Sequence, residues 1–347
     1  MKRIVFVFAY ILCWVFVSAQ ESDKLRVVAE MDIRPGNVAV APSGRVFTTI
    51  HPLVSPEFQL VEITGRNNYE YFPNASYQNN TKVPASDKLD TPLGIRIDNQ
   101  NRLWIIDAGL NLGQTRLFGF DIDSKKEIFR FDFPETIAPK SSFIQDLAVD
   151  DENGWVYLAD IGNPGILALN LKTLDIRRFT SETVQAEKVD MIIDGEIINF
   201  GGAPASVAVN PITLSSDKET LFYGAMNGIT WYKLPAKMFR EGRTDFDIDT
   251  SIKIIGPKPV SDGAATDALG NHYFTNIQHY GVDVLTSNGD LKHLIRDARI
   301  DWPDNVALGP EGWIYVTVNQ LHKTPAFTGG KDEGEGPFYI YKIKLEE

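Results

Sequence analysis

Cysteine is almost absent from this chain of 347 residues: the one cysteine, Cys13, lies in an apolar stretch near the N-terminus. A single cysteine cannot form an internal disulfide, and it cannot build the cysteine-rich sites that hold structural zinc. Stability must therefore come from the burial of apolar side chains, for which a chain of this length has enough residues.

Long apolar runs are also missing, apart from residues 4–17. This run follows two basic residues and ends at the small residues Ser18 and Ala19, which is the pattern of a secretory signal peptide. It is shorter than the ~20 residues that a membrane-spanning helix needs. We therefore expect residues 1–19 to be a signal peptide that is cleaved after Ala19. Residues 20–347 are then secreted or periplasmic, with no membrane attachment after cleavage.

Basic residues are outnumbered: 34 lysines and arginines stand against 46 aspartates and glutamates, and the formal net charge is -12. Phosphate backbones and anionic lipids repel such a surface, so we expect neither nucleic acid nor a membrane among the partners. An acidic surface suits a cationic ligand or a metal ion, although acidity also serves solubility alone. The sequence has no glycine-rich phosphate loop, no HExxH zinc motif and no Gly-x-Ser-x-Gly elbow.

What the chain does contain is a hairpin pattern that recurs along its whole length. Each copy has a short apolar strand, a polar turn that usually contains glycine, and a second apolar strand rich in aromatic residues. Internal repetition of this kind is typical of propellers and solenoids. The copies span residues 36–49, 93–107, 145–160, 205–225, 261–276 and 304–319.

Further strand-like runs follow the copies, so that each repeat supplies four antiparallel strands. Residues 282–286 and 291–295 are one such pair, joined by a turn with the Asn-Gly signal of a hairpin. Six repeats of four strands predict an all-β fold, a six-bladed β-propeller. The last repeat has only residues 338–345 after its hairpin, so we expect residues 25–31 to supply its missing outer strand and close the ring. The propeller is then a single domain, residues 20–347.

Antiparallel geometry places the start of each first strand and the end of each second strand at the same mouth of the central channel. Asp262 and Asp304 are the strongest candidates there, because each starts an innermost strand beside the axis. The alternative for an aspartate at a strand end is that it caps a loop. In the repeat 205–225, alignment on the turn puts Ala205 at the corresponding position. The candidate ligand-binding residues at this mouth are Asp262, Asp304, Asp146, Asn305, Asn276, His51, His279 and Asn319.

The acidic stretch 261–276 has the look of a calcium loop, because Asp262 and Asp267 precede Gly270. A strand rises about 3.3 Å per residue, which puts the two carboxylates on the order of 16 Å apart. They cannot bind one ion, so Asp262 is left as the metal candidate of this hairpin.

Residues 182–202 form a segment that is long for a propeller loop. Long loops on a rigid scaffold often carry function. The segment contains an apolar stretch, residues 189–193, which predicts that part of it packs against the propeller. Our hypothesis is that it forms a lid over the central channel.

Three stretches of the sequence resemble a known family. They are YGAMNGITWYKLP at residues 223–235, SDGAATDALGNHYFTN at 261–276 and DWPDNVALGPEGWIYVT at 301–317. They resemble the major royal jelly/yellow protein family, in particular its bacterial, dopachrome-tautomerase-related members. The resemblance implies a secreted six-bladed propeller with a ligand pocket in the central channel, where some relatives bind small amines and others are linked to melanin chemistry. This chain departs from the insect members in lacking their disulfide-forming cysteines.

A more distant resemblance is to the regucalcin/gluconolactonase propellers. It implies a divalent cation, Ca or Mg, held at the starts of first strands by a Glu, two Asn and an Asp. The segment Ser261-Asp262-Gly263 matches the segment that carries their Asp, so Asp262 carries over as a metal ligand. The other three positions align with Gly36, Gln145 and Ala205, of which the glycine and the alanine cannot ligate a metal through a side chain.

We therefore expect an exported royal jelly/yellow-like propeller that binds a small molecule, aromatic or cationic, in its central channel. The alternative is an enzyme that uses the carboxylates at the channel mouth. That enzyme would be either a dopachrome-tautomerase-like isomerase with acid–base groups or a metal-dependent lactonase-type hydrolase. No cofactor is certain from the sequence, and a divalent cation is the one candidate.

Overall fold

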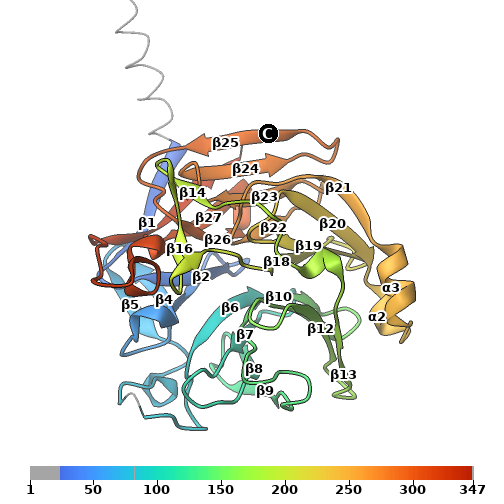
Figure 1. The fold of residues 1–347 in the computed structure, drawn as a ribbon. Helices are drawn as coiled ribbons and strands as arrows, with labels where there is room; N and C mark the ends of the chain where they lie inside the picture. The colour runs from blue at the N-terminus through green and yellow to red at the C-terminus, as the bar shows by residue number, and fades with distance from the viewer. Residues whose placement is uncertain (1–23, 82, 346–347) are drawn as a thin grey trace, which may run out of the picture.

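The computed structural model describes residues 24–81 and 83–345 of the chain. Six four-stranded antiparallel sheets stand around a central axis like the blades of a propeller (Figure 1). The predicted signal peptide, residues 1–19, lies outside the described residues. Within them, no helix is both long enough and apolar enough to cross a lipid bilayer.

Each blade runs from an inner strand at the axis to an outer strand at the rim. The inner strands of adjacent blades contact one another around the axis. The first three blades are β2 (Pro35–Val40), β3 (Val46–Ile50), β4 (Leu60–Gly65) and β5 (Asn68–Tyr71); β6 (Pro92–Ile97), β7 (Arg102–Asp107), β8 (Arg116–Asp121) and β9 (Glu127–Asp132); and β10 (Ile144–Asp150), β11 (Trp155–Asp160), β12 (Gly165–Asn170) and β13 (Ile176–Phe179). The next two are β18 (Val209–Leu214), β19 (Thr220–Ala225), β20 (Thr230–Pro235) and β21 (Lys253–Pro257); and β22 (Ala264–Thr266), β23 (His272–Asn276), β24 (Gly281–Leu285) and β25 (Leu291–Arg296).

The sixth blade joins the two ends of the chain. It consists of β26 (Pro303–Leu308), β27 (Trp313–Val318), β28 (Phe338–Lys344) and, as its outermost strand, β1 (Leu25–Met31). β1 pairs with β28 in antiparallel register, from Leu25 opposite Ile343 to Met31 opposite Phe338. The predicted six-bladed all-β fold and its closure by the N-terminal strand are both confirmed.

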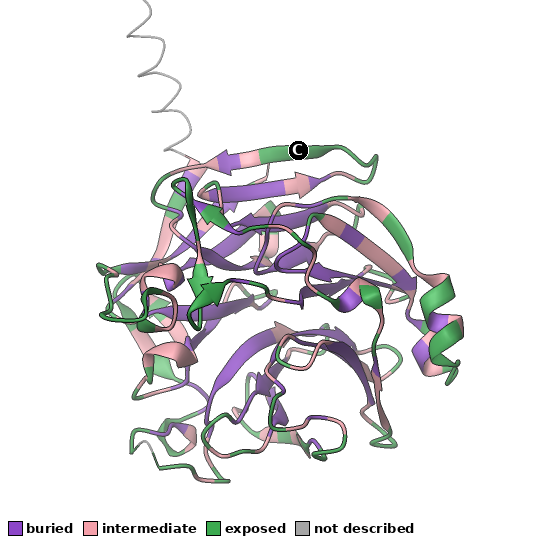
Figure 2. Cartoon of the chain, viewed as in Figure 1, coloured by how far each residue is buried: buried purple, intermediate pink, exposed green. Residues whose placement is uncertain are grey.

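Burial follows the distance from the axis, as Figure 2 shows. All seven residues of the inner strand β10 are buried, because both of its faces pack against neighbouring blades. Along the outer strand β9, half-buried and exposed residues alternate, since one face packs inward and the other meets water. The core is therefore a set of apolar layers between adjacent blades, and it fixes where the inner strands lie.

The structure corrects the register of the fourth blade. β18 begins at Val209, which pairs with Ala225, and the polar turn of the hairpin follows Leu214. The turn-based alignment predicted that Ala205 starts the inner strand of this blade. That prediction is wrong, because Ala205 lies before the first residue of the strand. The alignment placed the start of this longer turn five residues too early, at Asn210 instead of Ser215. The predicted start of the inner strand was therefore five residues too early as well.

Residues 182–205 form a segment that we call the cap. It contains the short helix η3 (Glu182–Val184) and two small hairpins, β14 (Ile192–Ile193) with β15 (Glu196–Ile197), and β16 (Asn199–Phe200) with β17 (Ala203–Pro204). Met191 and Ile193 of the cap are buried in one apolar cluster with residues that flank the strands of blades four to six at the mouth of the channel: Met226, Val260, Ile277, Trp302 and Leu321. The cap thus lies over the mouth at which the inner strands begin, in agreement with the lid hypothesis.

Helices are few and short among the described residues. α2 (Lys237–Arg240) and α3 (Asp245–Ser251) connect β20 to β21 at the rim (Figure 1). α4 (Pro325–Thr328) follows β27 and packs against the cap, where Phe327 and Phe200 bring their ring centroids to 4.9 Å. The loop after β27 therefore supports the cap from the side.

Candidate functional site

An irregularity shared by the inner strands shapes the channel. Near their starts, β2, β6, β18 and β26 each leave two residues without partners on the neighbouring strand. A bulge of this kind bends the strand and re-aims side chains. With the corresponding residues of β10 and of the segment before β22, the first unpaired positions form what we call the ring: Gly36, Leu93, Gln145, Asn210, Asp262 and Asp304.

Threonines on the second strands hold the backbone at the ring in blades five and six. The Thr275 hydroxyl accepts hydrogen bonds from the backbone N–H groups of Asp262 and Gly263, both at 3.0 Å. The Thr317 hydroxyl accepts from the N–H of Asn305 at 3.1 Å. A buried N–H without a partner would destabilise the fold, so these hydroxyls make the interrupted pairing tolerable.

Among the ring residues, the Asp262 side chain accepts the largest number of hydrogen bonds. The side-chain amides of Gln145 and Asn210 donate to its Oδ1 at 2.9 and 2.6 Å, and the indole N–H of Trp302 donates to its Oδ2 at 3.0 Å. Burial and the neighbouring Asp304 carboxylate raise the pKa of Asp262 well above its usual range, and the three donors oppose that shift. Asp262 therefore connects its own blade to three others through one carboxyl group.

Sequence reasoning missed Asn210. Its position in the ring became visible once the hairpin was aligned on its true turn, which begins at Ser215, since five residues before that point lies Asn210. The signal was present in the sequence, because Ser215 and Asp217 belong to the residue types that open turns. With Asn210 in place of Ala205, the ring has four polar side chains instead of three.

Asp304 lies beside Asp262 and is 1% exposed. The Asn319 amide donates to its Oδ2 at 2.7 Å, and its Oδ1 is buried without a hydrogen-bond partner among the described residues. Burial raises the pKa of Asp304 to about 7; the Asn319 hydrogen bond opposes this shift and the Asp146 carboxylate adds to it. Asp304 can therefore gain or lose a proton near neutral pH.

His51 faces Asp304 from the end of β3. Its Nε2 lies 3.8 Å from Asp304 Oδ2, while its Nδ1 accepts a hydrogen bond from the Leu53 N–H at 3.3 Å. Burial, with a contribution from the positive charge of Arg34, lowers the pKa of His51 to about 3. The imidazole is therefore neutral at pH 7, and this hydrogen bond assigns its proton to Nε2.

Asp146 follows Gln145 on β10 and is 1% exposed. Arg96 of β6 donates to its Oδ2 at 2.9 Å. Burial raises the pKa of Asp146 to about 6, and the charge of Arg96 opposes that shift. Asp146 is therefore the one predicted carboxylate whose charge is balanced by an arginine.

Three oxygens around Asp304 and Asp262 are buried acceptors without donors among the described residues: Asp304 Oδ1, Asn210 Oδ1 and Asn319 Oδ1. Buried polar atoms normally have partners, so these three unsatisfied acceptors require an explanation. In the part of the chain that the structure describes, no three acidic, histidine or cysteine side chains converge closely enough to hold a metal by themselves. A metal in this place would need amide oxygens as ligands.

The remaining predicted site residues make their hydrogen bonds to other groups. Asn305 links blades six and one, because its Oδ1 accepts from the Val38 N–H at 3.4 Å. The Asn276 amide donates at 2.7 Å to Asp283 on the next strand outward. His279 is exposed, and its backbone N–H donates to Asn276 Oδ1 at 3.1 Å. The structure thus brings Asp262, Asp304, Asn319 and His51 together, and places Asn276 and His279 outside.

Two glycines allow the inner strands to approach one another at this level. A Cβ on Gly94 would lie 2.4 Å from the Gln145 carbonyl oxygen, and one on Gly263 would lie 2.8 Å from the Asn305 Cα. Both distances are too short for any side chain, because the obstacle is backbone. Close packing of adjacent strand starts therefore keeps this end of the channel narrow.

The sequence profile of the family described as "Major royal jelly protein" matches residues 91–326, which is more than half of the chain. Major royal jelly protein 9 of Apis mellifera is 25% identical over 186 residues, which cover 50% of this chain and 42% of the honeybee protein. Protein yellow of Drosophila melanogaster is 25% identical over 126 residues, 33% of this chain and 23% of that protein. The chain thus spans less than half the length of these relatives.

Solved structures share the architecture at low identity. A calcium-binding protein, regucalcin, from Agrobacterium tumefaciens gives a TM-score of 0.57 at 15% identity, covering 92% of this chain and 93% of that one. Virginiamycin B lyase from Staphylococcus aureus gives 0.56 at 14% identity, covering 93% and 98%. At such identities the likeness shows the fold alone. The family profile carries the assignment: the chain belongs to the major royal jelly protein family.

Proposed function

We propose that this protein binds a small cationic ligand in the capped end of its central channel. The observation that carries the proposal is the set of three buried acceptor oxygens without donors, on Asp304, Asn210 and Asn319. Acceptors that lack donors are satisfied by a cation or by a group rich in N–H donors, and buried carboxylates add the matching charge. The acidic net charge of the chain favours the approach of such a ligand.

Two kinds of cation suit these residues. Ca²⁺ and Mg²⁺ prefer oxygen ligands, which Asp262, Asp304 and the amides of Asn210 and Asn319 would supply. A primary ammonium group offers three N–H donors and would use the same acceptors. Because Asp262, Asp304 and Asn210 are buried, a bare ion or a compact amine fits this end better than a large aromatic ring does.

The alternative proposal is an enzyme, and two observations support it. Asn210 and Gln145 supply amides at ring positions where the lactonase-type propellers resembled here use asparagine, so a metal-dependent hydrolase gains support. Asp304, with a pKa of about 7, would serve as the acid–base group of that hydrolase or of a tautomerase-like isomerase. A bound divalent ion would supply Lewis acidity to such a reaction.

A thermal-shift titration tests the binding proposal. Purified protein is titrated with CaCl₂, MgCl₂ and methylamine, in the wild type and in the variants Asp304→Asn and Asn210→Ala, with Glu57→Gln as a control for loss of an exposed acid. A ligand present at about 100 times its Kd stabilises by about 2.7 kcal/mol, which gives a shift of a few degrees. We expect the shift in the wild type and the control and its loss in the two ring variants. No shift with any probe, or equal shifts in all four proteins, would contradict the proposal.

Turnover distinguishes the enzyme from the binding protein. A panel of lactones and dopachrome is assayed with and without the stabilising ion. Turnover that Asp304→Asn lowers by about a hundredfold or more supports the enzyme, in line with general acid–base catalysis. Binding without turnover of any panel member supports a binding protein.

We also propose that the chain is exported and cleaved after Ala19, on the strength of the N-terminal sequence pattern. Small molecules are then its partners, with neither nucleic acid nor a membrane after cleavage, as the acidic charge favours. Mass spectrometry of the protein from the culture medium or periplasm gives the mature N-terminus. A chain that starts at Gln20 agrees with the proposal, and one retained in the cytoplasm with its first residues intact does not.

A further inference from the structure

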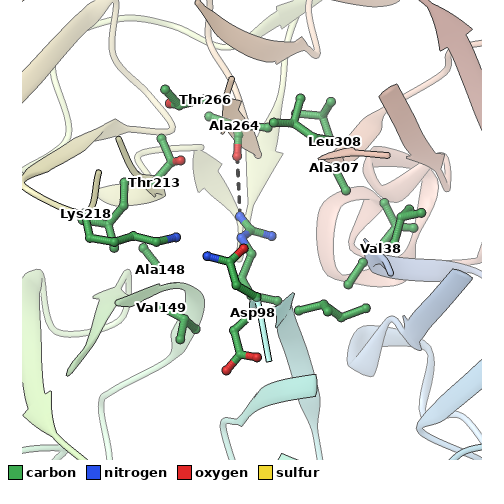
Figure 3. Close-up of a pocket in the computed structure, with 18 residues that line it drawn as sticks. Val38, Asp98, Ala148, Val149, Thr213, Lys218, Ala264, Thr266, Ala307 and Leu308 are labelled. Atoms are coloured by element: carbon green, nitrogen blue, oxygen red, sulfur yellow. Dashed lines mark hydrogen bonds between the residues drawn. The ribbon is translucent and has the colours of Figure 1, made fainter. Parts of the chain in front are cut away.

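The channel is open at the end opposite the cap. A cavity of about 200 Å³ lies there, lined by residues near the ends of the inner strands of all six blades (Figure 3). These lining residues lie at least two positions beyond the ring along each strand. The cavity is therefore a separate compartment of the same channel.

Small aliphatic side chains form most of its wall. Ala148, Ala264 and Ala307 line the opening together with Val149 and Leu308 (Figure 3). Ala307 is half-buried, so a larger residue at this position would take up part of the space. A liquid water occupies about 30 Å³, so the cavity has room for a small molecule and not for a polymer chain.

Arg96 is one of the charged residues that line the cavity. Its Nη2 donates to Asp146 Oδ2 at 2.9 Å and more weakly to the Ala264 carbonyl at 3.5 Å, the contact drawn as a dashed line in Figure 3. Its Nη1 donates to the Ile95 carbonyl at 3.0 Å. A guanidinium has five N–H donors, and within the described residues its Nε has no acceptor. The side chain is 20% exposed, so donors remain for a ligand in the cavity.

The other charged groups at the cavity leave a surplus of donors. The Lys218 amino group lines it, 3.7 Å from the Asp151 carboxylate, which is a loose pairing. Asp98 also lines it, but its Oδ2 already accepts from the Trp104 indole at 2.7 Å and from Arg102 at 2.6 Å. The acid at the wall is therefore engaged, whereas the two cations keep N–H groups available.

We propose that the open end of the channel binds a small organic carboxylate. The anionic group meets Arg96, with Lys218 at the side, and the apolar body lies against the alanine wall. Arginine binds a carboxylate through paired N–H groups, which gives both orientation and affinity. The Arg96–Asp146 pair separates this compartment from the cation site proposed above, so one protein would hold ligands of opposite charge at the two ends of one channel.

Calorimetric titration with benzoate tests the proposal, with benzamide as the uncharged probe of the same shape. We expect benzoate to bind at least about tenfold more tightly than benzamide, since a hydrogen bond to a charged group is the difference between them. Inorganic phosphate is the third probe and should bind more weakly than benzoate, because it gains nothing from the apolar wall.

Matched variants locate the binding. Ala307→Leu fills the cavity without touching the Arg96–Asp146 pair, and the double variant Arg96→Met/Asp146→Asn removes the guanidinium without leaving a buried carboxylate unpaired. Each should weaken benzoate binding about tenfold or more, whereas Arg66→Gln, on the outer surface, should not change it. The proposal is overturned if benzoate and benzamide bind alike, if phosphate binds as well as benzoate, if both cavity variants bind normally, or if benzoate gives no heat at tens of millimolar.

Discussion

At the scale of single residues, the capped end of the channel depends on carboxyl groups kept away from water. Asp262 and Asp304 are both buried, and the pKa of each is raised because the charged form loses its hydration there. Such groups destabilise the folded protein when they ionise, unless a cation joins them. The ring therefore carries a cost in stability that a bound cation would relieve.

The first prediction concerns the pH dependence of stability. An unfolded aspartate titrates near 3.8, whereas folded Asp304 keeps its proton up to about pH 7. Between these values the folded state binds more protons, so the contribution of Asp304 to stability falls as the pH rises through that window. Asp304→Asn removes this titration and should gain on the order of 1–3 kcal/mol relative to wild type between about pH 4.5 and pH 8.

Urea unfolding followed by tryptophan fluorescence at the two pH values measures this difference. His51 titrates in both proteins, and its lowered pKa gives the opposite dependence, so its contribution cancels in the comparison. The difference that remains belongs to Asp304 together with Asp262, whose pKa the Asp304 carboxylate raises. Glu57→Gln serves as the control and should follow the wild type. A difference between wild type and Asp304→Asn that is the same at both pH values would show that Asp304 titrates normally.

The second prediction concerns the contact between blades two and three. Gly94→Ala places a Cβ 2.4 Å from the Gln145 carbonyl oxygen, and this obstacle cannot rotate away because it is backbone. We expect a loss of about 2–4 kcal/mol in the free energy of unfolding. Gly330→Ala is the matched control, since its Cβ would meet nothing within 4 Å. Equal stability of the two variants in urea would mean that the inner strands are free to separate.

At the scale of elements, the blade hairpin was predictable and the cap was only partly so. Alternating apolar residues and turn signals are local, so the sequence located the hairpins of five blades correctly. In the fourth blade, residues 205–209 have the same apolar spacing as an inner strand, but the structure assigns Ala205 to the cap. Which of the two similar segments enters the sheet depends on where the turn to β19 begins, and the turn residues Ser215 and Asp217 mark that position.

The site was predictable to a similar degree. The rule that strand starts and ends share one mouth identified Asp262, Asp304, Asn319 and His51, which the structure brings together. It also selected Asn276 and His279, because the rule gives the level of a residue along the axis and not the direction of its side chain. The pairing of Asn276 with Asp283 comes from the neighbouring strand β24, which the rule ignores.

The third prediction is that the cap opens as a unit while the propeller stays folded. Met191→Ala with Ile193→Ala removes the two buried anchors of the cap, which should destabilise it locally by roughly 2–5 kcal/mol. Hydrogen exchange should then accelerate in residues 189–205 and near Trp302, with little change in the urea midpoint of the whole protein. Leu234→Ala, in the core between blades three and four, should instead lower that midpoint. A lowered midpoint in the cap variant would show that the cap is part of the global folding unit.

At the scale of the whole molecule, the propeller is held closed by the pairing of two strands, β1 from the N-terminal part of the chain and β28 from the C-terminal part. β1 contributes Leu25, Ala29 and Met31 to the buried core between the sixth blade and its two neighbours, blades five and one. Without disulfides in the described chain, no covalent link supports this closure. The stability of the entire propeller therefore depends on a seven-residue strand.

The fourth prediction follows from that closure. Removal of residues 24–31 exposes the edge of β28 and part of the core, and should lower the free energy of unfolding by about 3–6 kcal/mol. The urea midpoint of the truncated protein measures the loss, and a synthetic peptide of residues 24–31 added in excess should restore part of it. Arg26→Ser, an exposed change on the same strand, is the control. A truncated protein with the wild-type urea midpoint would show that the propeller stays closed without β1.

The pairing of β1 with β28 also has a consequence in time. The ribosome makes β1 first among the described strands and β28 last, so the sixth blade is incomplete for nearly the whole of synthesis. The outer strand must wait in solvent while five blades emerge behind it, and long-range pairing of this kind is slow to form. A nascent chain of this design therefore keeps its sixth blade open until β28 is released.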